Sequence, residues 1–120
     1  MKKELNEREN FYKINIEFDE MVELAQDVAS DVWGPREPMK MMGKLKEEVG
    51  ELEDAIRNNP SVALHRFNAM KELGDVLFCV FRLADNLGLD STSALALTIV
   101  KIQERDKFNV ANKKVPKDES

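Results

Sequence analysis

The chain has 120 residues, enough for one domain with a core of modest size. Hydrophobic residues make up 42% and charged residues 34%, which is typical of a globular chain and not of a disordered one. The formal net charge of −5 argues against a nucleic-acid polymer as partner. The single cysteine, Cys79, excludes an intrachain disulfide. No signal-peptide pattern opens the sequence and no apolar run is long enough for a membrane span, so we expect a cytoplasmic protein.

Residues 1–15 are polar and mixed, and we expect a loose N-terminal arm there. The first helix is expected from Phe18 to Val32, because apolar residues recur every three or four positions. Gly34 and Pro35 then end the helical pattern. A second helix is expected from about Met39 to Arg57, ahead of a break at residues 58–60.

The third helix is expected from about Ser61 to Asn86, with Asn59 as its cap and Pro60 at its first position. Its expected inner face carries apolar side chains at helical spacing: Leu64, Phe67, Met70, Leu73 and Leu77. Residues 76–81 are apolar on every side, which a monomer of this size can hardly bury. We therefore expect this stretch to form a subunit interface.

Gly88 ends the third helix, and a fourth is expected from Asp90 or Ser91 to about Phe108. A polar C-terminal tail follows at residues 109–120. The pattern as a whole predicts one all-α domain over residues 16–108. We expect a four- to five-helix bundle that homo-oligomerisation completes.

Two acidic motifs lie within the second and third helices. The first is Glu47, Glu48 and Glu51, and the second is Glu72 and Asp75. A three-residue step keeps two carboxylates on one helix face, so antiparallel packing of the two helices would bring four of them together. Close carboxylates resist burial unless a cation joins them. An all-oxygen site suits Mg²⁺, or Mn²⁺.

The simpler interpretation is a solvated acidic face, supported by pairs such as Lys44 with Glu48. The joint pattern of the two motifs favours a metal site over that interpretation. A di-iron carboxylate bundle would need Glu-x-x-His pairs. The chain contains none, and its only histidine is His65.

The two motifs, followed by an apolar run and a basic fourth helix, resemble the signature of the MazG-like all-α nucleoside triphosphate pyrophosphohydrolases. The resemblance covers roughly residues 18–108. It implies Mg²⁺-dependent cleavage between the α and β phosphates of a nucleotide, giving a nucleoside monophosphate and pyrophosphate. It also implies a homodimer or homotetramer of helical bundles.

By motif position, the resemblance implies that Glu48, Glu51, Glu72 and Asp75 are metal ligands. Glu47 would be a further ligand or would orient the attacking water, so Glu47 and Glu48 are the catalytic candidates. Lys101 and Arg105, four residues apart, would hold phosphates unless they are solvated surface charges. Lys44, and Lys40 one turn before it, are further phosphate candidates.

Trp33 is expected either to cap the bundle or to stack on a nucleobase. The residues around it depart from some larger family members, in which Trp-Asp precedes the second helix, whereas Gly34 follows Trp33 here. The sequence therefore leaves open which nucleobase the protein prefers.

The broadest function is house-cleaning hydrolysis of dNTPs or non-canonical NTPs. Narrower alternatives are a dUTPase-like or a phosphoribosyl-ATP pyrophosphohydrolase activity. A non-catalytic helical interaction module is the alternative outside enzymes.

Overall fold

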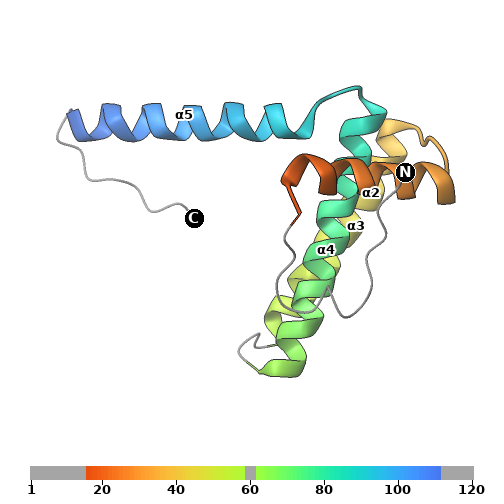
Figure 1. The fold of residues 1–120 in the computed structure, drawn as a ribbon. Coiled ribbons are helices and arrows are strands. Elements are labelled where there is room, and N and C mark those ends of the chain that lie inside the picture. Colours follow the sequence, from red (N-terminus) through yellow and green to blue (C-terminus); the bar gives the residue numbers. More distant parts are fainter. Residues whose placement is uncertain (1–15, 59–61, 112–120) are drawn as a thin grey trace. The chain divides into compact units, whose positions relative to one another are not determined.

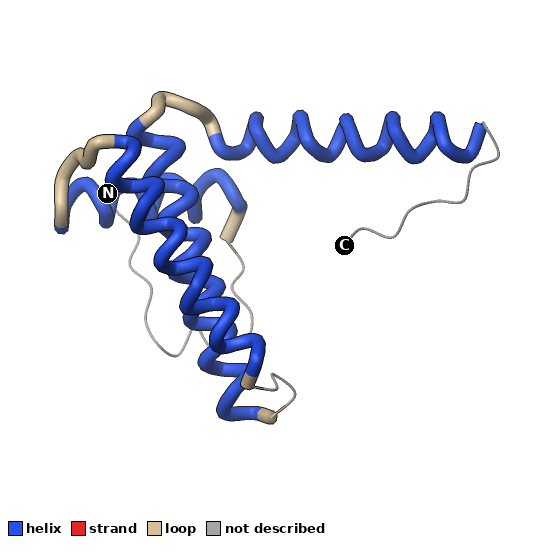
Figure 2. The backbone as a smooth tube through the Cα atoms, turned by 180° about the vertical axis from the view of Figure 1, so that it is seen from behind, coloured by secondary structure: helices blue, strands red, loops and turns tan. Residues whose placement is uncertain are grey.

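The computed structural model describes residues 16–58 and 62–111 (Figure 1). In these ranges the chain forms four helices and no strand. Figure 2 shows the helices in blue and the loops that join them in tan. They are α2 (Phe18–Val32), α3 (Pro38–Arg57), α4 (Ala63–Asn86) and α5 (Ser91–Ala111). The expected all-α fold is confirmed. No helix among the described residues is long and apolar enough to cross a membrane.

Two glycines end helices by adopting backbone angles that other residues rarely reach. Gly34, with φ of 73°, follows α2 and donates its N–H to the Ser30 carbonyl at 3.0 Å. Gly88, with φ of 68°, follows α4, and the next N–H, from Leu89, bonds back to the Ala84 carbonyl at 2.9 Å. These bonds satisfy carbonyls that a helix end would leave without partners.

Local capping likewise fixes where α3 and α5 begin. The Glu37 carboxylate accepts hydrogen bonds from the N–H groups of Met39 and Lys40, and Pro38 opens α3. Asp90 accepts from both the N–H and the hydroxyl of Ser93, which lowers the Asp90 pKa.

Some helix limits differ from those expected from the sequence. The third helix, α4, begins at Ala63, two residues later than predicted, and the expected cap residues Asn59 and Pro60 lie outside the described residues. The fourth, α5, continues past Phe108 to Ala111. The expected arm at residues 1–15 also lies outside the described residues, as do tail residues 112–120.

The chain forms two compact units, one ending at Leu89 and one starting at Asp90. In the first unit, α4 packs against both α3 and α2. Figures 1 and 2 both show α3 and α4 running side by side. Phe18 on α2 meets Phe81 on α4 edge to face, with ring centroids 5.8 Å apart, and Gln26 donates to the Phe81 carbonyl at 3.0 Å. In the part of the chain that the structure describes, the buried apolar side chains are few: Val22, Ala29, Met41, Ala55 and Cys79.

The apolar stripe that the sequence assigned to the inner face of α4 is exposed in the single chain. Leu64 is 73% exposed, and the other four members range from 40% to 47%. The side chains that are at least half-buried on α4 lie on a different face, which includes Glu72, Val76 and Cys79. The prediction for the inner face was wrong because periodicity locates an apolar stripe without showing what covers it.

Met41 offers a test of the small core, because its side chain is less than 2% exposed, the lowest exposure among the described residues. Met41→Ala should reduce the free energy of unfolding by about 2–4 kcal/mol, since a cavity would replace its buried contacts. Met39→Ala is the matched control. Met39 is 70% exposed, so its loss should change stability by about 0.5 kcal/mol or less. Urea unfolding measures both, and equal losses would contradict this description of the core.

Candidate metal centre

The structure brings together the four acidic residues expected to bind metal. Glu48 and Glu51 lie one turn apart on α3, and Glu72 and Asp75 lie one turn apart on α4. Because these helices pack against each other, one carboxylate oxygen from each residue lies within 4.8 Å of the other three. The cluster is therefore built from two helix faces and needs no loop to position it.

Two of these carboxylates are partly removed from water without enough hydrogen-bond donors. Glu48 is only 6% exposed, and Glu72 is half-buried. The Oε2 atom of each is buried and has no hydrogen-bond partner among the described residues. Burying an ionised oxygen in this way is costly unless a donor or a cation meets it. The donor set fits a hard cation such as Mg²⁺, which binds carboxylate oxygens.

One ammonium group offsets part of the negative charge. Lys44 Nζ lies 3.0 Å from Glu48 Oε1 and 4.0 Å from Glu47 Oε1. The hydrogen bond to Glu48 raises the Lys44 pKa, and the same bond lowers the Glu48 pKa although burial opposes this. Glu51 behaves differently: its hydrogen bond with Glu48 and the charge of Glu48 raise the Glu51 pKa. The negative charge of Glu48 therefore opposes ionisation of Glu51, and a metal ion could offset that charge.

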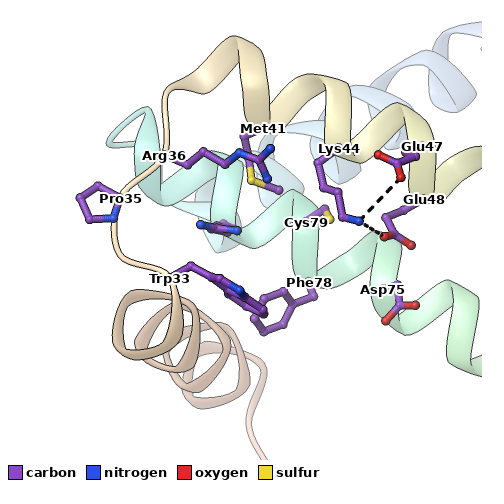
Figure 3. Close-up of a pocket in the computed structure, with 11 residues that line it drawn as sticks. Trp33, Pro35, Arg36, Met41, Lys44, Glu47, Glu48, Asp75, Phe78 and Cys79 are labelled. Atoms are coloured by element: carbon purple, nitrogen blue, oxygen red, sulfur yellow. Dashed lines mark ion pairs between the residues drawn. The ribbon is translucent and has the colours of Figure 1, made fainter.

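A cavity of about 710 Å³ opens beside the cluster and shares Glu48 and Asp75 with it (Figure 3). The volume is in the range of small-molecule sites. Its lining mixes apolar, acidic and basic side chains: Trp33, Pro35, Arg36, Met41, Lys44, Glu47, Glu48, Asp75, Phe78, Cys79 and Arg82.

Three other residues selected from the sequence line this cavity, namely Trp33, Lys44 and Glu47. Lys40 is exposed and is not part of the lining. Lys101 and Arg105 lie on α5 in the second unit, where both side chains are exposed. Their phosphate-binding role stays a prediction.

Sequence reasoning missed two arginines in the lining, Arg36 and Arg82. Arg82 follows Asp75 by seven residues, which is close to two helical turns and places both on one face of α4. Phe78 lies between them and meets Trp33 at nearly a right angle, with ring centroids 6.1 Å apart. The i, i+3, i+7 spacing from Asp75 could have identified this wall of the cavity.

A carboxylate cluster on two paired helices, beside a cavity large enough for a nucleotide, defines a helical protein suited to metal-dependent chemistry on a small ligand. The MazG nucleotide pyrophosphohydrolase domain matches residues 36–110, which contain both acidic motifs. The chain belongs to the MazG family. No curated protein and no solved structure gives a significant match.

Glu51→Gln tests the electrostatic repulsion, because it removes one charge and nearly keeps the volume. We expect the metal-free variant to melt at a higher temperature than the wild type. The raised Glu51 pKa means that its ionisation costs stability as the pH rises from the ordinary value of 4.5 through that raised pKa. The difference in melting temperature should therefore be larger at pH 7.5 than at pH 4.5.

Glu53→Gln is the matched control on the same helix, since Glu53 pairs with Arg57 at 2.6 Å and is not in the cluster. This variant should not gain stability. Added Mg²⁺ should raise the melting temperature of the wild type and of Glu53→Gln more than that of Glu51→Gln. A metal-free Glu51→Gln protein that melts below the wild type would contradict the repulsion.

Proposed function

We propose that the protein hydrolyses nucleoside triphosphates to nucleoside monophosphate and pyrophosphate in a Mg²⁺-dependent reaction. House-cleaning of dNTPs or non-canonical NTPs in the cytoplasm is the function that fits best. The observation that carries the proposal is the cluster of four carboxylates within 4.8 Å of one another, in a chain of the MazG family.

Glu48, Glu51, Glu72 and Asp75 are the proposed ligands of Mg²⁺, with Mn²⁺ as a possible substitute. When bound, the metal would lower the pKa of a water molecule and neutralise charge on the leaving pyrophosphate. Glu48 also lines the cavity, so we assign it a second role as a catalytic residue beside Glu47.

The other residues act on water and substrate. Glu47 lines the cavity with its side chain 64% exposed, so its carboxylate can accept a hydrogen bond from the attacking water and orient it. Lys44, in the same cavity, is proposed to bind phosphate oxygens, and Lys101 and Arg105 of α5 to hold the distal phosphates. Trp33 offers a flat surface for a nucleobase.

The alternative hypothesis is that the protein is a non-catalytic helical interaction module. The cluster argues against it, because a pure scaffold would gain stability by replacing repelling acids with apolar side chains. The dUTPase-like and phosphoribosyl-ATP alternatives use the same cleavage chemistry and differ only in substrate.

We expect the protein to release pyrophosphate from at least one dNTP or NTP when Mg²⁺ is present, and not after chelation. A panel of common and damaged nucleotides, including dUTP and phosphoribosyl-ATP, measures this. Asp75→Asn should abolish turnover while the protein stays folded. Orthophosphate as the sole product would refute the assigned bond, and absence of turnover over the whole panel would favour the non-catalytic module.

We also propose that the protein is a homodimer, or a larger homo-oligomer, joined through α4. Within the expected interface stretch 76–81, Leu77 and Val80 are 44% and 39% exposed, whereas Phe78 and Phe81 pack on aromatic rings of their own chain. Phe67, Met70 and Leu73 extend the exposed surface, with exposures between 40% and 47%. An exposed apolar surface on this scale is typical of an interface. Covering it would contribute about 25 cal/mol per Å² of apolar area removed from water. A two-fold pairing is the simplest arrangement that covers the stripe and adds helices to the first unit.

Sedimentation velocity at micromolar concentration should show at least a dimer. Leu77→Lys should shift the protein to monomer, because it would bury an ammonium group in the interface. A wild-type monomer would contradict this assignment of the stripe.

A further inference from the structure

The cavity has an acidic end and an end lined by aromatic and basic side chains. Glu47, Glu48 and Asp75 lie on one side of it in Figure 3, and Trp33, Pro35 and Arg36 lie on the other. The acidic side belongs to the proposed metal centre. The opposite side combines aromatic surface with guanidinium groups, and the proposed reaction assigns no role to those groups.

Arg82 is held firmly but has no anionic partner. Its Cζ lies 5.1 Å from the centroid of the Trp33 ring, and one Nη donates to the Gly34 carbonyl at 3.2 Å. Among the described residues, no carboxylate lies within ion-pair distance of Arg82, and its Nε atom has no hydrogen-bond partner. The guanidinium group of Arg82 is half-buried and fixed in place, and its Nε–H has no acceptor among the described residues. It can therefore donate a hydrogen bond to an acceptor atom of a ligand.

Arg36 supplies further donors from the loop between α2 and α3. Its side chain is exposed and lines the same cavity, and no hydrogen bond or ion pair joins it to the described residues. Arg36 follows Gly34 by two residues, so the bond from Arg82 to the Gly34 carbonyl also anchors the start of the loop that carries Arg36.

We propose that Arg82 and Arg36 read the nucleobase, and that they select bases with carbonyl oxygens over those with an amino group in the same place. The proposal rests on the proposed function for the assignment of the cavity to a nucleotide. Arginine offers five N–H donors and no acceptor. It therefore matches the paired O6 and N7 acceptors of guanine, and it opposes the N6 amino group of adenine. The same reasoning favours uracil, with O4, over cytosine, with N4.

The surroundings favour a base over a phosphate at this end. Trp33 and Phe78 present ring surface, and Met41 adds an apolar side chain. A base can stack on such surfaces while its edge meets the arginine donors. A phosphate placed there would lose water against apolar groups, whereas the metal centre already offers it a partner.

The activity test compares kcat/KM for pyrophosphate release from dGTP with dATP, and from dUTP with dCTP. We expect the wild type to favour the carbonyl base in each pair by about tenfold or more. Arg36→Gln and Arg82→Gln should reduce each ratio towards one, mainly by slowing the carbonyl substrates. Arg36→Gln is the cleaner variant, since no hydrogen bond or ion pair joins Arg36 to the described residues. Arg66→Gln is the control, because Arg66 is an exposed residue of α4 outside the cavity.

A binding test separates this proposal from the hydrolysis itself. Trp33 is the only tryptophan, so its fluorescence reports directly on the cavity. With Mg²⁺ present, dGMP should quench it at about tenfold lower concentration than dAMP, and Arg36→Gln should remove that difference.

Equal losses on all four triphosphates in the arginine variants would overturn the proposal and indicate phosphate contacts. A wild type that hydrolyses both members of each pair equally would overturn it while leaving the proposed function intact. Tighter binding of dGMP without any hydrolysis would support base reading and refute the proposed function. Equal binding of dGMP and dAMP would overturn base reading.

Discussion

Repulsion among four carboxylates, held within 4.8 Å of one another by the pairing of α3 with α4, is the constraint on which the rest of the structure depends. The buried residues of α3 are Met41, Glu48 and Ala55, seven residues apart, so Glu48 occupies the middle of the contact with α4. An apolar side chain there would pack without an electrostatic cost. The contact between α3 and α4 therefore contains a charged side chain where an apolar one would bury more apolar surface. Among the described residues, Lys44 is the one cation that pairs with Glu48.

The position of the carboxylate cluster between α3 and α4 also explains the outward apolar face of α4. One face of the helix supplies Glu72 and Asp75 to the cluster, so its larger apolar residues occupy other faces. Among the described residues, α2 and α3 pack against α4, and residues such as Leu73 and Leu77 stay 47% and 44% exposed. The buried Glu48 and half-buried Glu72 between the helices, and the apolar residues on the outward face, are two consequences of one arrangement. On this basis the proposed metal centre and the proposed oligomer depend on each other.

The sequence predicts the helices well because their limits are set locally. Gly34 and Gly88 adopt positive φ, and Pro38 opens α3. The carboxylate cluster is also predictable, since helical spacing fixes which side chains share a face. Which face of α4 is covered within the chain cannot be predicted from the sequence, because an apolar stripe has the same pattern whether its own chain or a partner buries it. The proposed base-binding role of Arg82 could not be predicted from the sequence either, since it depends on a hydrogen bond to Gly34, 48 residues away.

The cations of the cavity differ in how their charge is offset, and this links metal binding to substrate binding. Lys44 is neutralised by Glu48, whereas Arg82 meets only the Trp33 ring and a carbonyl group. A metal ion at the cluster would compete with the Lys44 ammonium for Glu48. Lys44 would then be free to bind phosphate oxygens next to the metal. Because linkage is reciprocal, a phosphate that draws Lys44 away would equally favour the metal on Glu48. Metal and nucleotide would therefore bind cooperatively through one ammonium group, while Arg82 would meet the base whether or not metal is bound.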